Sequence, residues 1–110
     1  MNKYTELSDF EINKKVAEKL GLAYEVTRYG VVTRMSNKEQ WREFNPCNNP
    51  ADAMPIIIEN KISMYFVSDD IGWAARDSDT DYGELECIDK NYYRAAMILF
   101  LLMKDAENEG

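Results

Sequence analysis

The segment from residue 90 to residue 104 is the part of this 110-residue chain that most constrains its fold. Its length suits a helix, and within it residues 95–103 form an uninterrupted apolar run. A surface helix keeps one polar face, so a helix that is apolar almost all round must be covered on more than one side. The run is far shorter than the roughly 20 residues of a membrane span. The helix is therefore either central to the fold or buries its outer face in a homodimer.

The start of another helix is marked near the N-terminus. Ser8 and Glu11 have the spacing of a capping box, in which each side chain accepts a hydrogen bond from the other residue's backbone N–H. A stripe of apolar residues follows at four-residue intervals, and Gly21 then stops the helix. The predicted stripe is Ile12, Val16 and Leu20.

A second helix is predicted to begin at Asn49-Pro50, because an Asn N-cap followed by proline is typical of a helix start. Pro55 falls inside this helix, where it kinks the axis. The run Ile56-Ile57-Ile58 fits a strand as well as a helix. We favour a short, kinked helix.

Strands are indicated at residues 24–35, which the turn Tyr29-Gly30 divides in two, and at residues 62–67, 71–76 and 82–88. Asp89 is predicted to cap the last helix. The element order is then αββαβββα in a single domain, residues 1–110. We predict an α+β fold of the α-β-α sandwich type, with a mostly antiparallel sheet of about four or five strands and helices packed on both faces.

The charge pattern restricts the partners. The net charge is −7, and residues 62–110 carry four basic and eleven acidic side chains, whereas residues 1–61 carry nine of each. The whole surplus therefore lies in the second half, which repels nucleic-acid phosphates and attracts basic partners. Direct binding of nucleic acid is disfavoured.

The absence of histidine restricts the chemistry. It removes Ser-His and Cys-His nucleophile pairs and His-ligated zinc. Cys47 lies just before a helix start, where a thiol pKa can fall, but without a neighbouring base its predicted role is packing. No catalytic motif is present, which argues against an enzyme, and no cofactor or metal is expected.

An acidic patch is the alternative source of chemistry. Residues 77–81 resemble the first half of a calcium loop, but Tyr82 stands where the turn glycine belongs and Ile88 where the bidentate glutamate belongs. A carboxylate-held metal acting on nucleic acid or nucleotides would use residues of this region. The candidates are Asp77, Asp79, Asp81, Glu84 and Glu86.

The loop before the second helix carries the interaction candidates. Aromatic and arginine side chains are enriched at protein interfaces, and two large rings in a loop either contact a partner or hold the loop to the core. The candidates are Trp41, Arg42, Phe44, Asn45 and Asn48.

The block Phe44-Asn45-Pro46-Cys47-Asn48-Asn49-Pro50 resembles the NinX-type phage proteins, as do residues 7–13, 20–26, 57–63, 87–91 and 94–98. The resemblance covers nearly the whole chain. It implies a gene of the early, recombination-associated region of lambdoid phages and prophages, and it supports the helix at residues 50–60. A more distant likeness is to the small phage α-β-α sandwich domains. No catalytic residue can be carried over from the family.

Together these features predict a non-enzymatic phage accessory protein that binds a host or phage protein, with a homodimer contact also open. The alternatives are the carboxylate-metal enzyme above and an acidic mimic of DNA that inhibits a host DNA-binding protein. The N-terminus has no apolar export signal, so we expect the protein in the host cytoplasm and not in a membrane.

Overall fold

The computed structural model of the chain describes residues 3–77 and 85–109. The described elements follow the predicted order, with one short strand added before the second helix. They are α1 (Asp9–Leu20), β1 (Ala23–Thr27), β2 (Gly30–Arg34), β3 (Arg42–Glu43), α2 (Pro50–Glu59), β4 (Ile62–Ser68), β5 (Gly72–Asp77), β6 (Glu86–Asp89) and α3 (Tyr92–Glu109). The α+β class is confirmed.

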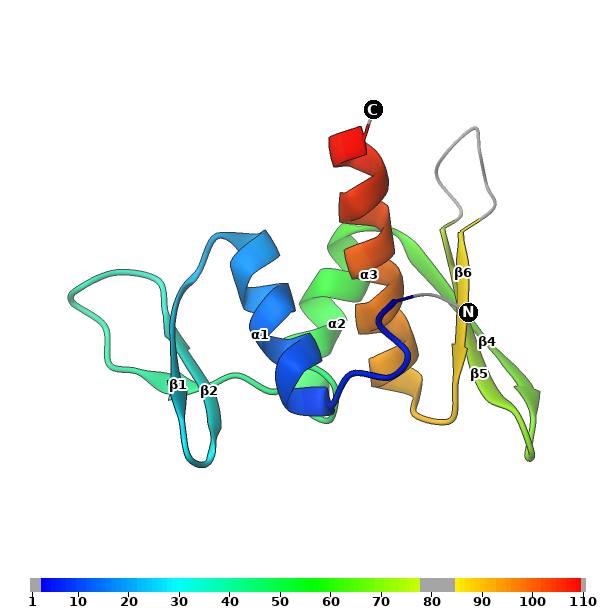
Figure 1. Ribbon diagram of the computed structural model, residues 1–110, viewed down its shortest axis with the longest axis horizontal. Coiled ribbons are helices and arrows are strands. Elements are labelled where there is room, and N and C mark those ends of the chain that lie inside the picture. Colours follow the sequence, from blue (N-terminus) through cyan, green and yellow to red (C-terminus); the bar gives the residue numbers. More distant parts are fainter. Residues whose placement is uncertain (1–2, 78–84, 110) are drawn as a thin grey trace.

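The layering differs from the prediction of one sheet between helices. The described strands form two antiparallel three-stranded sheets, an N-terminal sheet in the order β1-β2-β3 and a C-terminal sheet in the order β4-β5-β6. The three helices lie between them (Figure 1). The chain leaves β3 through a loop into α2, which carries it to the far side of the molecule before β4 begins. The strands after α2 therefore pair with each other and not with β1 or β2.

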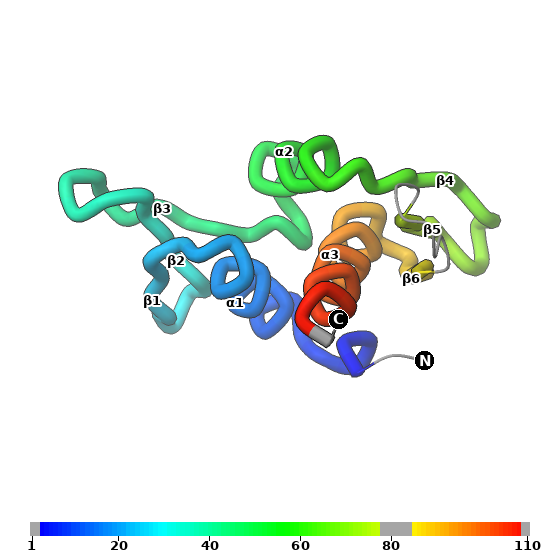
Figure 2. Tube along the Cα trace, turned by 90° about the horizontal axis from the view of Figure 1, so that it is seen from above, coloured from blue at the N-terminus to red at the C-terminus, as the bar shows by residue number. Residues whose placement is uncertain are grey.

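Helix α3 is the centre of the fold, which confirms the first of the two predicted alternatives. All of residues 95–101 have 0% exposure. The helix packs against α1, α2 and β5, and Figure 2 shows it between α1, α2 and the C-terminal sheet. The apolar surface that could have formed a dimer contact is thus consumed within one chain.

The start of α3 corrects one prediction. Asn91, not Asp89, caps the helix, because Asn91 Oδ1 accepts hydrogen bonds from the backbone N–H groups of Tyr93 (2.8 Å) and Arg94 (3.2 Å). Asp89 instead accepts a hydrogen bond from the Asn91 N–H, at 2.8 Å. The asparagine lies next to the first helical residue, where a short side chain reaches the free N–H groups. Helix α3 also continues to Glu109, beyond the predicted end at residue 104.

The first two helices begin as predicted. Ser8 and Glu11 make both hydrogen bonds of the capping box. Asn49 accepts a hydrogen bond from the Ala51 N–H at 3.0 Å, and α2 runs to Glu59 with Pro55 inside it. The predicted stripe of α1 is right for Ile12 and Val16 but not for Leu20, which is 38% exposed because the helix ends there beyond the core. Among the described residues, no helix has the length and apolarity that a membrane crossing requires.

Candidate functional site

A surface groove of about 240 Å³ lies where α1, the β1–β2 turn and the loop after β3 meet. We call residues 44–49 of that loop the asparagine loop. The groove combines aromatic rings with amides and charged groups. Its lining comprises Asp9, Phe10 and Asn13 of α1, Arg28, Tyr29 and Gly30 of the turn, Val31 of β2, Glu43 of β3, and Phe44, Asn45 and Asn48 of the asparagine loop.

The amides of the groove are held by one another. Asn45 Oδ1 accepts hydrogen bonds from Asn13 Nδ2 (2.8 Å) and Asn48 Nδ2 (3.1 Å). Asn13 Oδ1 accepts a hydrogen bond from the Cys47 backbone N–H at 3.0 Å. Asn13 is 5% exposed, so a core position of α1 holds a polar group that the asparagine loop satisfies. These bonds fix the loop against α1 and orient its side chains in advance.

Behind the groove, Arg94 ties the start of α3 to the N-terminal segment. Its Nη1 donates to Asp9 Oδ1 at 2.7 Å and its Nε donates to Asp89 Oδ1 at 3.2 Å. Its Nη2 donates to the carbonyl oxygens of Thr5 (3.1 Å) and Leu7 (2.7 Å). Burial alone would lower the pKa of Arg94, but the hydrogen bond to Asp9 and the charges of Asp89 and Asp9 outweigh it and raise that pKa. Arg94 is therefore charged and structural.

Asp9 links this network to the groove. While its Oδ1 accepts from Arg94, its Oδ2 accepts a hydrogen bond from Asn48 Nδ2 at 3.0 Å. Asn48 Oδ1 accepts from Asn91 Nδ2 at 3.2 Å. Because Arg94 is shared between the Asp9 and Asp89 carboxylates, this end of the groove presents hydrogen-bonding amides beside a residual negative charge.

Cys47 is fully buried beneath the asparagine loop. Burial, with the nearby Asp9 carboxylate as the next contribution, raises the pKa of its thiol to about 12. The thiol is therefore protonated at neutral pH and is not poised as a nucleophile. Its position fits the predicted packing role.

The structure separates the five interaction candidates into two groups. Phe44, Asn45 and Asn48 come together at the groove, with Phe44 only 6% exposed, so its ring also holds the loop to the core. Trp41 does not line the groove: it is 37% exposed, and the Arg34 guanidinium lies 4.3 Å from its ring centroid. Arg42 is exposed and reaches Asp52 at 3.9 Å.

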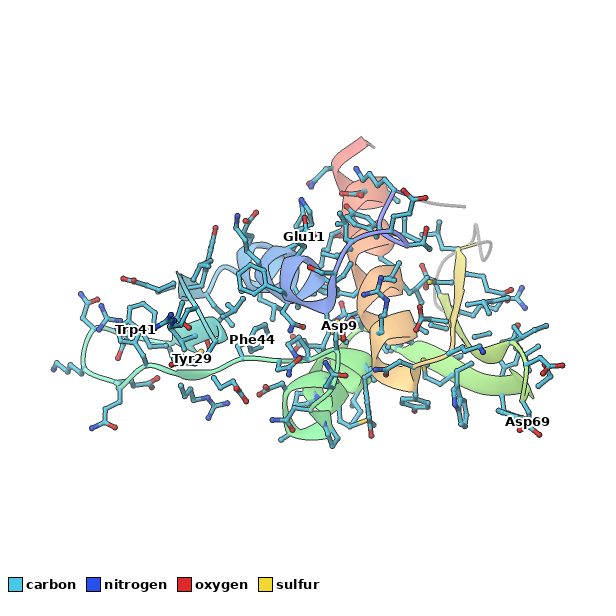
Figure 3. The ribbon with its side chains drawn as sticks, turned by 60° about the horizontal axis from the view of Figure 1, so that its bottom comes forward. Asp9, Glu11, Tyr29, Trp41, Phe44 and Asp69 are labelled. Atoms are coloured by element: carbon cyan, nitrogen blue, oxygen red, sulfur yellow. The ribbon has the colours of Figure 1, made fainter. Side chains whose placement is uncertain are left out.

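Sequence reasoning missed the contribution of the β1–β2 turn. Tyr29 is 85% exposed on the groove lining, and the Arg28 guanidinium stands 5.8 Å from its ring centroid. Figure 3 shows Phe44 between Tyr29 and Asp9. The available signal was an aromatic residue at the tip of a hairpin, where polar residues are the rule.

The acidic candidates do not converge in the described part of the chain. Asp79, Asp81 and Glu84 lie outside the described residues. Asp77 is 1% exposed, whereas Glu86 is exposed and accepts a hydrogen bond from the Tyr65 hydroxyl at 2.6 Å. Glu86 pairs with Arg76, the neighbour of Asp77, so Glu86 and Asp77 point to opposite faces of the sheet. Within residues 3–77 and 85–109, no three metal-ligating side chains are grouped to hold an ion.

Fold and groove together describe a small α+β protein in which fixed amides and an exposed tyrosine share one surface. The family model described as Bacteriophage P22, NinX matches residues 3–104. The chain belongs to this family and is a phage accessory protein of the NinX type, as the sequence resemblance indicated. A comparison with curated proteins finds no match to the chain. The groove residues all lie within the part that the family model matches.

Proposed function

We propose that this protein works in the host cytoplasm by binding another protein, host or phage, through the groove. The observation that carries the proposal is the pairing of a preorganised amide floor with the exposed ring of Tyr29. Side chains that are already fixed lose little conformational entropy on binding. Tyrosine and arginine, which stand together on the turn, are the residue types that most often carry interface energy.

The size of the groove favours a protein partner over a small ligand. Small-molecule sites usually enclose about 300–1,000 Å³, whereas this groove has about 240 Å³. A volume of that order holds one or two side chains that project from a partner's surface. The amide Nδ2 of Asn45 makes no hydrogen bond to another described residue. It can therefore donate to a carbonyl oxygen of the partner's backbone.

The alternative functions gain less support. A DNA mimic requires a continuous acidic strip over residues 69–89. Of the described carboxylates in that range, Asp77 is buried and Asp89 pairs with Arg94 at 3.2 Å. Asp69 and Asp70 lie in the β4–β5 turn, and Glu86 accepts a hydrogen bond from the Tyr65 hydroxyl. A carboxylate-metal enzyme requires acids that converge, and Asp77 and Glu86 face opposite ways.

Affinity capture with matched variants tests the proposal. The chain is used as bait in lysate from infected host cells, alongside the variants Tyr29→Ala and Met35→Ala. Met35 is the control, because it is 76% exposed but does not line the groove. We expect a partner that the unaltered chain and Met35→Ala both retain and that Tyr29→Ala loses. The dissociation constant measured with the purified partner should rise by roughly 30-fold in Tyr29→Ala, the effect of about 2 kcal/mol at an interface hot spot.

Loss of folding would mimic loss of binding, so thermal melting is measured on the same samples. Truncating a side chain as exposed as Tyr29 should change stability by no more than about 0.5 kcal/mol. A partner that binds both variants equally, or no partner retained by the unaltered chain, would overturn the proposal.

A further inference from the structure

Strand β4 is an unprotected sheet edge. It spans Ile62–Ser68 and pairs only with β5 within the C-terminal sheet of the described structure. Its free side lies on the outside of the molecule (Figure 2). Native edges are usually protected by charged residues or proline, but the seven residues of β4 include neither. Its one protective device is a bulge between Phe66 and Ser68, near the end of the strand.

The backbone directions along β5 can be assigned from one hydrogen bond. The Asp77 N–H donates to the Leu85 carbonyl at 3.1 Å, so the backbone of Asp77 points toward the β6 side. Successive residues of an antiparallel strand direct their N–H and C=O groups to alternate sides. Ala75 therefore also points toward β6, and Ala74 points toward β4.

The same alternation gives the free groups of β4. Tyr65 is the partner of Ala74, so its N–H and C=O groups point inward to β5. Met64 and Phe66, on either side of it, point theirs outward to the free edge. The edge thus presents the donors and acceptors of Met64 and Phe66, which stand symmetrically about Tyr65, and the same alternation points those of Ile62 outward.

We propose that β4 pairs antiparallel with β4 of a second copy of this chain, about a two-fold axis at Tyr65. Met64 then exchanges both backbone hydrogen bonds with Phe66 of the partner subunit, and the reciprocal pair does the same. Tyr65 faces Tyr65 of the partner subunit across a non-hydrogen-bonded position. The C-terminal sheets of the two copies, three strands each, then become one continuous sheet of six strands.

Charge complementarity favours a second copy as the occupant. Lys61 precedes β4 and Asp69 follows it, each four residues from Tyr65. Antiparallel pairing about Tyr65 sets the end of β4 that follows Lys61 in each copy beside the end that precedes Asp69 in the other, beyond the bulge between Phe66 and Ser68. The uncharged strand between them adds no repulsion, although the whole chain carries −7. Tyr65 and Val67, which are 44% and 38% exposed, lie on the outer face where the paired strands meet.

The paired strands leave the groove open. The groove lies beside α1 and the β1–β2 turn, whereas β4 lies at the opposite end of the molecule (Figure 1). The dimer is therefore independent of the proposed binding function. It would carry two grooves, each at the end of its subunit far from the paired β4 strands.

Sedimentation equilibrium of the full chain tests the pairing. We expect a dimer for the unaltered chain and at least about a 100-fold weaker association for Tyr65→Lys, which sets two like charges opposite each other. The matched control is Ile88→Lys, because Ile88 is equally exposed at 45% and in the same row of the sheet but lies on β6. It should remain dimeric. A monomeric unaltered chain would overturn the proposal, and so would dissociation by Ile88→Lys, which indicates stacked faces instead of paired edges.

A cysteine cross-link tests the position of the axis. The two natural cysteines are buried thiols outside any disulfide, so a new surface thiol reacts selectively. Under mild oxidation Tyr65→Cys should form a disulfide-linked dimer, because opposite residues on paired strands bring their Cβ atoms within about 5 Å. Ile88→Cys is the control. It should form no disulfide and run as a monomer on a non-reducing gel. No cross-link through Tyr65→Cys would contradict the two-fold at this residue and overturn the proposed register.

Discussion

The two sheets are equal in strand number, yet they are stabilised differently. The C-terminal sheet packs one face against α3, and on that face Ala75 and Cys87 are only 0% and 3% exposed. In the N-terminal sheet every residue of β1 except Tyr24 is exposed, and Val26 is 50% exposed. The region beside the N-terminal sheet is organised by side-chain hydrogen bonds around the asparagine loop. Apolar packing thus supports the C-terminal side, whereas on the N-terminal side the apolar contacts of Val31 and Phe44 are joined by a polar network that can also contact a partner.

The largest effect should come from the apolar side. Phe100 is fully buried in α3, so Phe100→Ala should lower the free energy of unfolding by about 3–5 kcal/mol through lost transfer energy and a cavity. Val26→Ala, a smaller truncation in the exposed β1, should cost about 0.5 kcal/mol or less. Urea denaturation followed by circular dichroism measures both. Equal losses would break the distinction between the two regions.

Arg94 connects the regions, and its removal should have the second largest effect. Arg94→Ala removes the charged donor that Asp9, Asp89 and the carbonyl oxygens of Thr5 and Leu7 share. Breaking a largely buried ion pair costs about 3–5 kcal/mol, and because Asp9 is partly exposed we expect about 2–3 kcal/mol. Arg94→Lys should recover only part of this, since one ammonium group cannot reproduce the planar fork. Full recovery by lysine in the same denaturation experiment would reduce the role of Arg94 to its charge.

Features that depend on residues close together in the sequence could be predicted from it, whereas features that depend on distant residues could not. The caps at Ser8 and Asn49 are local, and both were predictable from a few adjacent residues. The apolar run of α3 predicted a central helix. The division into two sheets was not predictable, because β3 is only two residues long and no periodicity states which sheet a strand will join.

The groove was only partly predictable for the same reason. Asn45 and Asn48 were found because they lie in one distinctive loop. Tyr29 joins them only after the β1–β2 hairpin packs beside α1. The donors of Arg94 reach Thr5 and Leu7 across separations of 89 and 87 residues, for which the sequence holds no local signal.

A smaller effect is expected where the N-terminal segment meets the end of α3. The Tyr4 hydroxyl donates a hydrogen bond to the Asp105 carboxylate, and Lys3 lies 3.2 Å from the same group. Burial, followed by the bond to Asp105, raises the pKa of Tyr4 above its ordinary value of 10.0. A raised pKa means that this contribution is complete below pH 10.0 and is lost as the pH rises through the folded-state value.

Tyr4→Phe should therefore lower stability by about 1 kcal/mol at neutral pH. Its difference from the unaltered chain should shrink in strongly alkaline solution. At the acid end, burial alone would raise the pKa of Asp105, but the bonds from Tyr4 and Lys3 prevail and lower it from 3.8. Asp105 therefore stabilises the fold above pH 3.8, and this contribution is lost as the pH falls further. Denaturation across the pH range checks both signs, and a difference that grows with alkali would contradict the assignment to Tyr4.

Site-specific photo-cross-linking tests the division between a packed side and a recognising side most directly. A benzophenone amino acid replaces Tyr29 in one variant and Met35 in another, two positions that are 85% and 76% exposed near the same sheet. After irradiation in infected cells, we expect a discrete cross-linked protein at position 29 and none at position 35. The same products at both positions, or no product at position 29, would contradict a partner bound in the groove.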